Sequence, residues 1–268
     1  MLLFKEMVPV RWFAKEPNFG DLLAPWLVQK ITGRQVALAK PDTPHYLVIG
    51  SIIKIAQPKT IVWGAGAFGT ETQNELCRYA TYLAVRGPLT RNKLDLNGIK
   101  CPRIYGDPAL LVPGFHKRKA APRYEVGVII RWSELNWQEN FDVHGVKKIY
   151  FGTADIEATL DALLDCKRIV SSSLHGLILA DAYGIPSAWL SSRSPKGKEF
   201  KFWDYFCSVK KPRDPMVYNI LQPGLTVEKL IGDLDYADSP IRIDLDLLRS
   251  ACPFGYDNDG EQGMGITG

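Results

Sequence analysis

Cysteine is scarce in this chain of 268 residues, and its spacing excludes two common kinds of scaffold. The five cysteines are odd in number and widely separated, and no two of them form a CxxC pair. Disulfide-stapled domains are small and dense in cysteines, usually with an even number, and structural zinc sites use closely spaced cysteine pairs. We therefore expect reduced thiols and no metal site, as in a cytoplasmic protein.

Long apolar runs are also missing from the sequence. No segment approaches the roughly 18 consecutive apolar residues that cross a membrane. The first ten residues contain Lys5 and Glu6, which interrupt the apolar stretch that a cleaved signal peptide needs. Internal repeats are absent as well, and a solenoid is therefore excluded. These absences predict a globular protein of the cytoplasm.

A strong excess of one charge is lacking too. The net charge is +4, from 33 Lys and Arg against 29 Asp and Glu. This bias is too weak to indicate a nucleic-acid partner. It suits an anionic small molecule, or a peripheral approach to the inner, acidic face of a membrane. The content of 46% hydrophobic and 23% charged residues is typical of a globular protein of one large or two modest domains.

Short apolar strands alternate with turns and helices in both halves of the chain. This alternation predicts an α/β fold with two parallel sheets, and so two Rossmann-like domains. The stretch 115–123 is basic, contains proline and lacks apolar periodicity, as an interdomain linker would. We therefore expect an N-terminal α/β domain over 1–114, a linker, and a C-terminal α/β domain over 124–252. The glycine-rich end, 253–268, is typical of a disordered tail.

The stretch 169–190 is the most informative part of the sequence. It predicts a strand, a turn of three serines, and a helix whose first turn contains His175. Free backbone N–H groups and the positive end of the helix dipole make such a position an anion pocket. A histidine there has a pKa suited to proton exchange near neutral pH. The alternative is a hydrogen-bonded core histidine, with the serines acting only as a cap and turn.

Two further positions are candidates because they follow predicted strands. Asn18, Gly20 and Asp21 form a strand–turn–helix junction, where Asp21 could bind a substrate hydroxyl or act as a base. The alternative is that Asn18 or Asp21 is a plain helix cap. Arg86 also follows a predicted strand and could grip a phosphate or carboxylate through paired hydrogen bonds. The alternative for Arg86 is a structural salt bridge.

The stretch 191–206 interleaves cations with aromatic rings. Aromatic side chains stack on sugars while cations hold anionic groups, and this pattern favours a binding loop. Its members include Lys196, Lys198, Lys201 and Trp203. The alternative is a basic loop that leads into a packed aromatic helix.

Five motifs follow one another along the chain: NFGDLL, WGAG, VRGPLTR, YGDPALLVP and SSSLHGLILADAYGIP. In this order they resemble the polysaccharide pyruvyl transferase family, and most closely its exopolysaccharide branch. The resemblance covers roughly residues 18–206. The resemblance implies the fold of the family, whose members are built like double-Rossmann glycosyltransferases of the GT-B type. It also implies that no cofactor is needed, because phosphoenolpyruvate is the donor substrate. The activity implied is transfer of the carboxyethylidene unit to two hydroxyls of a sugar or lipid-linked oligosaccharide, with release of phosphate.

The resemblance also implies roles for particular residues. The family's histidine falls on His175, its RGP arginine on Arg86, and its lysine on Lys196 or Lys198. The family's usual arginine before Leu-His is replaced here by Ser173, and Lys198, Arg193 or Arg131 could take its place. The catalytic candidates are His175 and Asp21. The donor-binding candidates are Arg86, Ser172, Ser173, Leu174, Gly176 and Lys198, and the acceptor-binding candidates are Asn18, Gly20, Lys196 and Trp203.

Two other classes of function remain open from the sequence. One is a glycosyltransferase of the same fold that uses a nucleotide sugar, with His175 and the basic loop holding the diphosphate. The other is a non-catalytic module that binds anionic polysaccharide.

Overall fold

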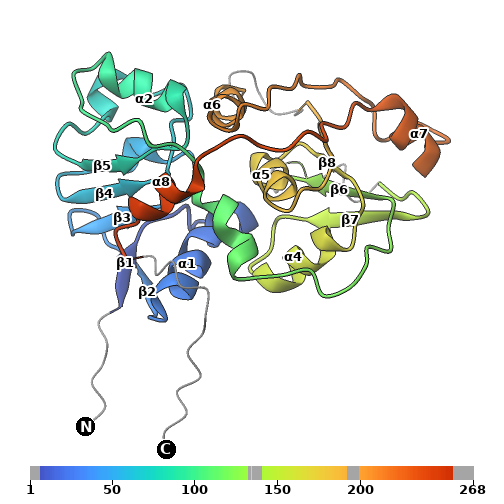
Figure 1. Ribbon diagram of the computed structural model, residues 1–268, viewed down its shortest axis with the longest axis horizontal. Coiled ribbons are helices and arrows are strands. Elements are labelled where there is room, and N and C mark those ends of the chain that lie inside the picture. Colours follow the sequence, from blue (N-terminus) through green and yellow to red (C-terminus); the bar gives the residue numbers. More distant parts are fainter. Residues whose placement is uncertain (1–6, 132–133, 135–140, 192–198, 256–268) are drawn as a thin grey trace, which may run out of the picture.

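Two parallel sheets lie side by side in the computed structural model, which describes residues 7–131, 134, 141–191 and 199–255 (Figure 1). The first sheet has the order β2 (Val36–Leu38), β1 (Val8–Val10), β3 (His45–Leu47), β4 (Thr60–Trp63) and β5 (Thr81–Ala84). The second has the order β7 (Val146–Tyr150), β6 (Val126–Ile130), β8 (Ile169–Ser171) and β9 (Ser187–Trp189). All pairings within the sheets are parallel, so the predicted α/β class with two parallel sheets is confirmed.

Helices connect the strands and cover the sheets. Local signals set their ends: Asn18 caps α1 through its side chain, and Gly33 ends α1 in the left-handed conformation. Pro88 occupies the first turn of α2, where its missing N–H costs no hydrogen bond. The helices are α1 (Phe19–Thr32), α2 (Pro88–Asp95), α4 (Ile156–Leu164), α5 (Leu174–Ala182), α6 (Phe200–Val209), α7 (Val227–Asp233) and α8 (Leu245–Ser250), with 3-10 helices η1 (Ile53–Ile55), η2 (Gln73–Glu75) and η3 (Pro108–Gly114).

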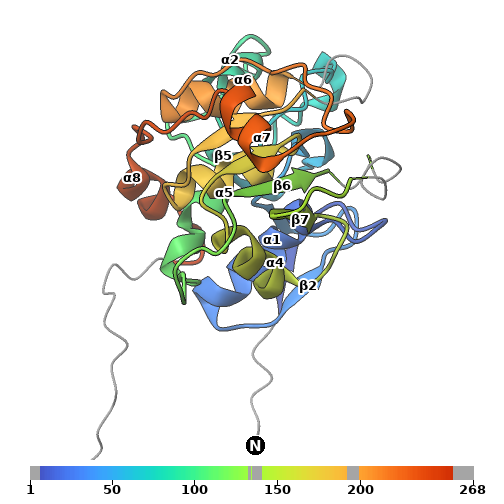
Figure 2. The same cartoon turned by 90° about the vertical axis from the view of Figure 1, so that its right-hand side faces the viewer.

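The two halves share one hydrophobic core. A single cluster of buried residues runs from β1 and α1 of the first half into α4 and α5 of the second. The Phe19 and Phe151 rings lie 4.4 Å apart between centroids, and the Phe19 backbone N–H donates to the Phe151 carbonyl at 2.9 Å. Figure 2 shows α1 beside α4, next to the strands of the second sheet. The halves are therefore packed against each other and not merely tethered.

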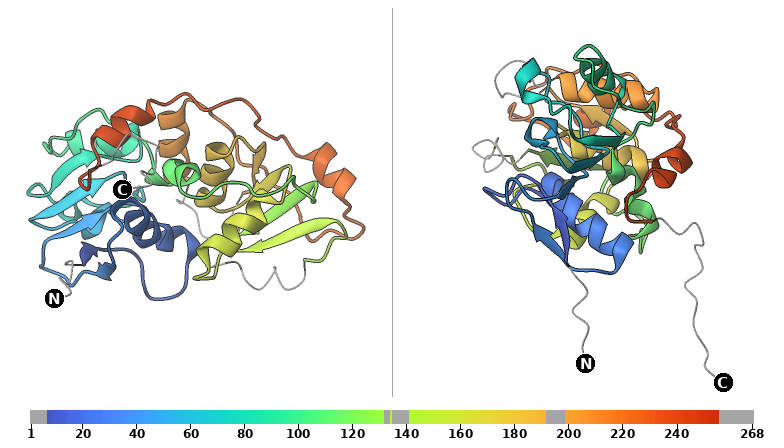
Figure 3. Two further views of the ribbon diagram at one scale, coloured as in Figure 1. Left: turned by 60° about the horizontal axis from the view of Figure 1, so that its bottom comes forward. Right: turned by 90° about the vertical axis from the view of Figure 1, so that its left-hand side faces the viewer.

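The last part of the chain returns to the first half. Helix α6 packs against α2, and α8 lies against the first half in both views of Figure 3. The Trp63 indole N–H donates to the Leu248 carbonyl at 2.8 Å. Phe254, at the start of the expected tail, instead packs its ring 4.7 Å from that of Tyr46. The rest of the expected tail, from residue 256 on, lies outside the described residues.

The stretch 115–123 runs along α4, and acidic side chains of α4 and its C-terminal end pair with its basic ones. His116 Nε2 lies 2.7 Å from Asp161 Oδ1, Lys119 pairs with the same carboxylate, and Arg123 pairs with Asp165. Part of the positive charge of the expected linker is thus neutralised within the fold. Within the described ranges, none of the helices combines the length and the apolar content that a bilayer span requires.

Candidate functional site

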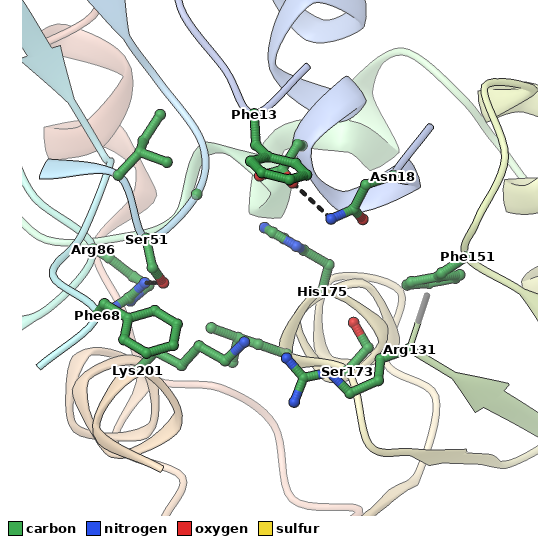
Figure 4. A pocket seen from close by; sticks show the side chains of 14 residues that line it. Phe13, Asn18, Ser51, Phe68, Arg86, Arg131, Phe151, Ser173, His175 and Lys201 are labelled. Atoms are coloured by element: carbon green, nitrogen blue, oxygen red, sulfur yellow. Dashed lines mark hydrogen bonds between the residues drawn. The ribbon is translucent and has the colours of Figure 1, made fainter. Parts of the chain in front are cut away.

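A cavity of about 390 Å³ opens where the carboxyl ends of the two sheets face each other (Figure 4). Each strand order contains one topological switch point, between β1 and β3 in the first sheet and between β6 and β8 in the second. Open α/β sheets bind ligands at such points. The loops that follow these four strands all contribute to the wall. The lining residues are Phe13, Asn18, Asp21, Gly50, Ser51, Ile52, Phe68, Arg86, Arg131, Phe151, Ser173, Leu174, His175 and Lys201.

His175 is the second residue of α5, as the sequence predicts, and its ring lines the cavity. Burial, together with the positive charges of Lys201 and Arg86, lowers the pKa of His175 to about 3. The ring is therefore neutral in the ligand-free cavity. The expectation that it titrates near neutral pH is wrong for this state, because the sequence does not reveal how deeply the ring is buried or which cations surround it.

The first turn of α1 lies directly against the His175 ring. A side chain at Gly20 would place its Cβ 2.2 Å from His175 Nδ1, so only glycine fits there. Asn18 Oδ1 accepts a hydrogen bond from the Gly20 N–H, and Asn18 Nδ2 donates to Asp21 Oδ2 at 2.6 Å. Asn18 is thus the helix cap, while Asp21 is oriented by it and lines the cavity.

The carboxyl group of Asp21 has an unusually high pKa. Burial raises the pKa of its carboxyl to about 7, although Lys201 and the hydrogen bond from Asn18 act in the opposite direction. A carboxylate that exchanges its proton near neutral pH is suited to act as a general base.

Arg86 lines the cavity, but its guanidinium already forms an ion pair and hydrogen bonds with other residues of the protein. Its guanidinium is 1% exposed and pairs with Asp204 of α6 at 3.0 Å. It also donates to Ser51 Oγ at 2.7 Å and to the Ala67 carbonyl at 2.6 Å. The salt-bridge alternative for Arg86 is therefore present in the structure. Gly66 leaves the space for it, since a Cβ there would lie 2.4 Å from Cζ of Arg86.

Two further cations complete the wall. Arg131 follows β6, and Lys201 comes from the first turn of α6. Figure 4 shows both side chains reaching into the cavity on the side of α5, below His175 in that view. Burial lowers the pKa of Arg131, and Glu134 opposes that effect. Lys201 belongs to the basic and aromatic stretch that the sequence singles out, but the lysines assigned there, Lys196 and Lys198, lie outside the described residues.

Four of the predicted site residues that the structure describes do not line this cavity, namely Gly20, Ser172, Gly176 and Trp203. The Ser172 hydroxyl is buried and donates to Glu134 at 2.9 Å. Gly176 packs against Ser171, whose Oγ would lie 2.3 Å from a Cβ at that position. Trp203 packs its ring against Trp189 in the aromatic cluster of α6. These residues pack next to the cavity wall and do not form its surface.

Aromatic side chains form the part of the wall that the sequence analysis missed. Phe13, Phe68 and Phe151 come from three different loops, and no periodicity marks them. Ser51 could have been predicted from the sequence, because it follows the carboxyl end of β3 as Arg86 follows that of β5. The described residues contain no group of three or more His, Cys, Asp or Glu side chains placed to hold a metal ion.

Comparison with known proteins identifies the family. Residues 38–194, more than half of the chain, match the model of the polysaccharide pyruvyl transferase family. The chain belongs to this family. The match contains His175, Arg86 and Ser173, whereas Asp21 and Lys201 lie outside it. The cavity is thus built partly from residues of the family region and partly from flanking ones.

Relatives of this pyruvyl transferase family member include a succinoglycan biosynthesis protein and two uncharacterized proteins. The succinoglycan biosynthesis protein ExoV of Rhizobium meliloti (strain 1021) is 27% identical over 74% of this chain, which spans 64% of ExoV. The uncharacterized protein L143 of Acanthamoeba polyphaga mimivirus is also 27% identical, over 78% of this chain and 77% of its own length. An uncharacterized Klebsiella pneumoniae protein of known crystal structure is 11% identical, with a TM-score of 0.46 over 74% of this chain and 87% of that one.

Proposed function

We propose that this protein transfers the carboxyethylidene unit of phosphoenolpyruvate onto two hydroxyls of a sugar in an exopolysaccharide repeat unit, with release of phosphate. The proposal rests above all on the cavity at the two switch points, where a histidine at a helix N-terminus lies among cations. Family membership and the likeness to ExoV support it. We also propose the GT-B type of double-Rossmann architecture for the two halves.

The donor fits the cationic side of the cavity. Phosphoenolpyruvate carries a phosphate and a carboxylate, and Lys201 and Arg131 supply two positive charges there. The first amides of α5, around Ser173 and Leu174, add backbone N–H donors and the positive end of the helix dipole. Arg86 contributes its charge to the field at His175, although its hydrogen bonds go to protein groups.

The reaction needs one proton delivered and two removed. His175, protonated once the anionic donor has entered, gives a proton to the methylene carbon, and the central carbon becomes electron-poor. A first sugar hydroxyl attacks that carbon, and Asp21 accepts its proton. The C–O bond to phosphate then breaks, the second hydroxyl closes the ketal, and its proton leaves with the phosphate. Two hydroxyl protons are thus lost, and one proton is gained by the new methyl group.

The acceptor fits the opposite side of the cavity. Asn18 and Asp21 lie there with hydrogen-bonding groups, and Phe13 and Phe151 offer flat apolar surfaces of the kind on which sugar rings stack. A cavity of about 390 Å³ is within the range of small-molecule sites and leaves room for a sugar beside the donor.

The test is to incubate the protein with phosphoenolpyruvate and candidate sugars or lipid-linked oligosaccharides, and to measure phosphate and product mass. A nucleotide sugar serves as the alternative donor in parallel. We expect phosphate release and a pyruvylated product, both abolished in His175→Gln at unchanged circular dichroism. Turnover of His175→Gln at the wild-type rate would remove His175 from the catalytic role. Glycosyl transfer from the nucleotide sugar would replace the proposal by a glycosyltransferase activity.

A further inference from the structure

The second nitrogen of the His175 ring faces a buried carboxylate from the other half of the protein. His175 Nε2 lies 3.8 Å from Asp107 Oδ2. Neither atom has a hydrogen-bond partner among the residues that the structure describes, although both are shielded from water. Buried polar atoms are nearly always paired, so two orphaned ones that face each other call for an explanation.

Asp107 is rigidly placed by its other oxygen. Its Oδ1 accepts a hydrogen bond from the Ala109 N–H at 3.0 Å and so caps η3. Helix η3 packs against α5, which carries His175. The free oxygen is therefore aimed at the ring by the fold of the first half, and an approach of less than about 1 Å would bring the pair to hydrogen-bond distance.

The arrangement also distinguishes the two ring nitrogens. Nε2 is enclosed on the side of Asp107, whereas Nδ1 lies beside Gly20 in the first turn of α1. A neutral imidazole carries only one proton, and the hydrogen bond made by one nitrogen decides the state of the other.

We propose that Asp107 is a positioning residue that accepts a hydrogen bond from His175 Nε2–H and thereby fixes the tautomer in which Nδ1 faces the substrate. This inference rests on the proposed function for its catalytic consequence. When the anionic donor neutralises the surrounding cations, the same carboxylate stabilises the imidazolium, whose Nδ1 proton then goes to the methylene carbon. Asp107 itself touches no substrate.

The charges around the pair are consistent with this role. Burial raises the pKa of Asp107 to about 6, while Arg86 lowers it and Asp204 raises it. Above that pH the carboxyl is ionised and can only accept a hydrogen bond. The charge of this carboxylate also raises the pKa of the Tyr205 hydroxyl, and the charges of Lys201 and Arg86 lower the pKa of the His175 ring.

Asp107→Asn tests the proposal with little change of shape. The introduced amide keeps its oxygen on the Ala109 N–H and turns its NH₂ group toward His175, which places a donor opposite Nε2. The chain has only four histidines, so the imidazole ¹⁵N signals of His175 can be assigned by difference from His175→Gln. We expect the proton on Nε2 in the wild type and on Nδ1 in Asp107→Asn.

Kinetics supply the second readout. We expect kcat to fall about 100-fold or more in Asp107→Asn, with KM for phosphoenolpyruvate changed by less than about threefold, as for an orienting carboxylate behind a catalytic histidine. Asp155→Asn, which changes the cap of α4 far from the ring, is the matched control and should leave kcat unchanged. An unchanged tautomer in Asp107→Asn, or a kcat within threefold of wild type, overturns the proposal. If no pyruvyl transfer is found at all, the ¹⁵N spectra still decide whether Asp107 sets the tautomer.

Discussion

At the scale of single residues, the cavity shifts the pKa values of two of its side chains, Asp21 and His175, far from their ordinary values. Burial raises the pKa of Asp21 to about 7 and lowers that of His175 to about 3. Both shifts favour the neutral form of the side chain. Displaced pKa values of this kind cluster at functional sites. The displacement has a cost in stability, and that cost can be measured.

Asp21→Asn should therefore stabilise the protein at alkaline pH. The folded-state pKa of Asp21 lies above its unfolded value of 3.8, so folding favours the protonated form and stability falls as the pH rises from about 4 to about 7. Above pH 7 the penalty is on the order of a few kcal/mol. The neutral amide avoids it. Denaturant unfolding should show a larger gain in stability of the variant over wild type at pH 8 than at pH 5.

The same variant should lose transfer activity, since an amide cannot accept the hydroxyl proton. Asp95→Asn, on the exposed side of α2, is the matched control and should change neither property. A gain in stability that is equal at both pH values would show that Asp21 is not held near a pKa of 7.

At the scale of elements, short-range signals predicted the helices that carry the site. The candidate cap at Asn18 begins α1, and the predicted turn of three serines leads into α5 with His175 in its first turn. Placing candidates at the carboxyl ends of strands also brought Asp21 and His175 to one cavity, as expected for parallel sheets.

Long-range partners could not be predicted, because nothing local encodes them. Arg86 and Asp204 are 118 residues apart in the sequence, and they meet only because α6 returns to the first half. The same return places Lys201 in the cavity wall. The facing of Asp107 and His175 likewise depends on how η3 packs against α5.

Gly20→Ala should inactivate the protein through a neighbouring element. The added methyl group would lie 2.2 Å from His175 Nδ1, so the ring must move. A displacement of about 1 Å at a reacting group can cost about 100-fold in rate. We expect a loss of that size in kcat, with helix α1 retained by circular dichroism.

Gly232→Ala is the matched control for this substitution. Gly232 lies in α7 with open space around its Cβ position, so alanine should stabilise the protein by about 0.5–1 kcal/mol and leave activity unchanged. Wild-type activity in Gly20→Ala would show that α1 does not constrain the ring.

At the scale of the whole molecule, the site lies between two halves that share a core. One hydrophobic cluster crosses the boundary, and α6 and α8 both return from the second half to the first. His175 from the second half and Asp21 from the first are thereby held in one cavity. This continuity predicts that the halves unfold together.

Leu248→Ala should test that coupling. Leu248 is fully buried in the shared cluster, and its side chain contacts the region of Gly106 in the first half. Its truncation should lower the free energy of unfolding by about 2–5 kcal/mol. Leu247→Ala, on the exposed side of α8, should change it by less than about 0.5 kcal/mol. Tryptophan fluorescence and circular dichroism should show one coincident transition in all three proteins, and two separate transitions would contradict the shared core.

The most direct test of the whole account is calorimetry of phosphoenolpyruvate binding at pH 7.5 in two buffers of different ionisation enthalpy. The ring of His175 is neutral in the empty cavity and must be protonated to act as the acid, so binding of the anionic donor should take up a proton. We predict close to one more proton taken up by the wild type than by His175→Gln. Absence of binding, or equal proton uptake by the two proteins, would contradict the assignment of this cavity as the donor site with His175 as its acid.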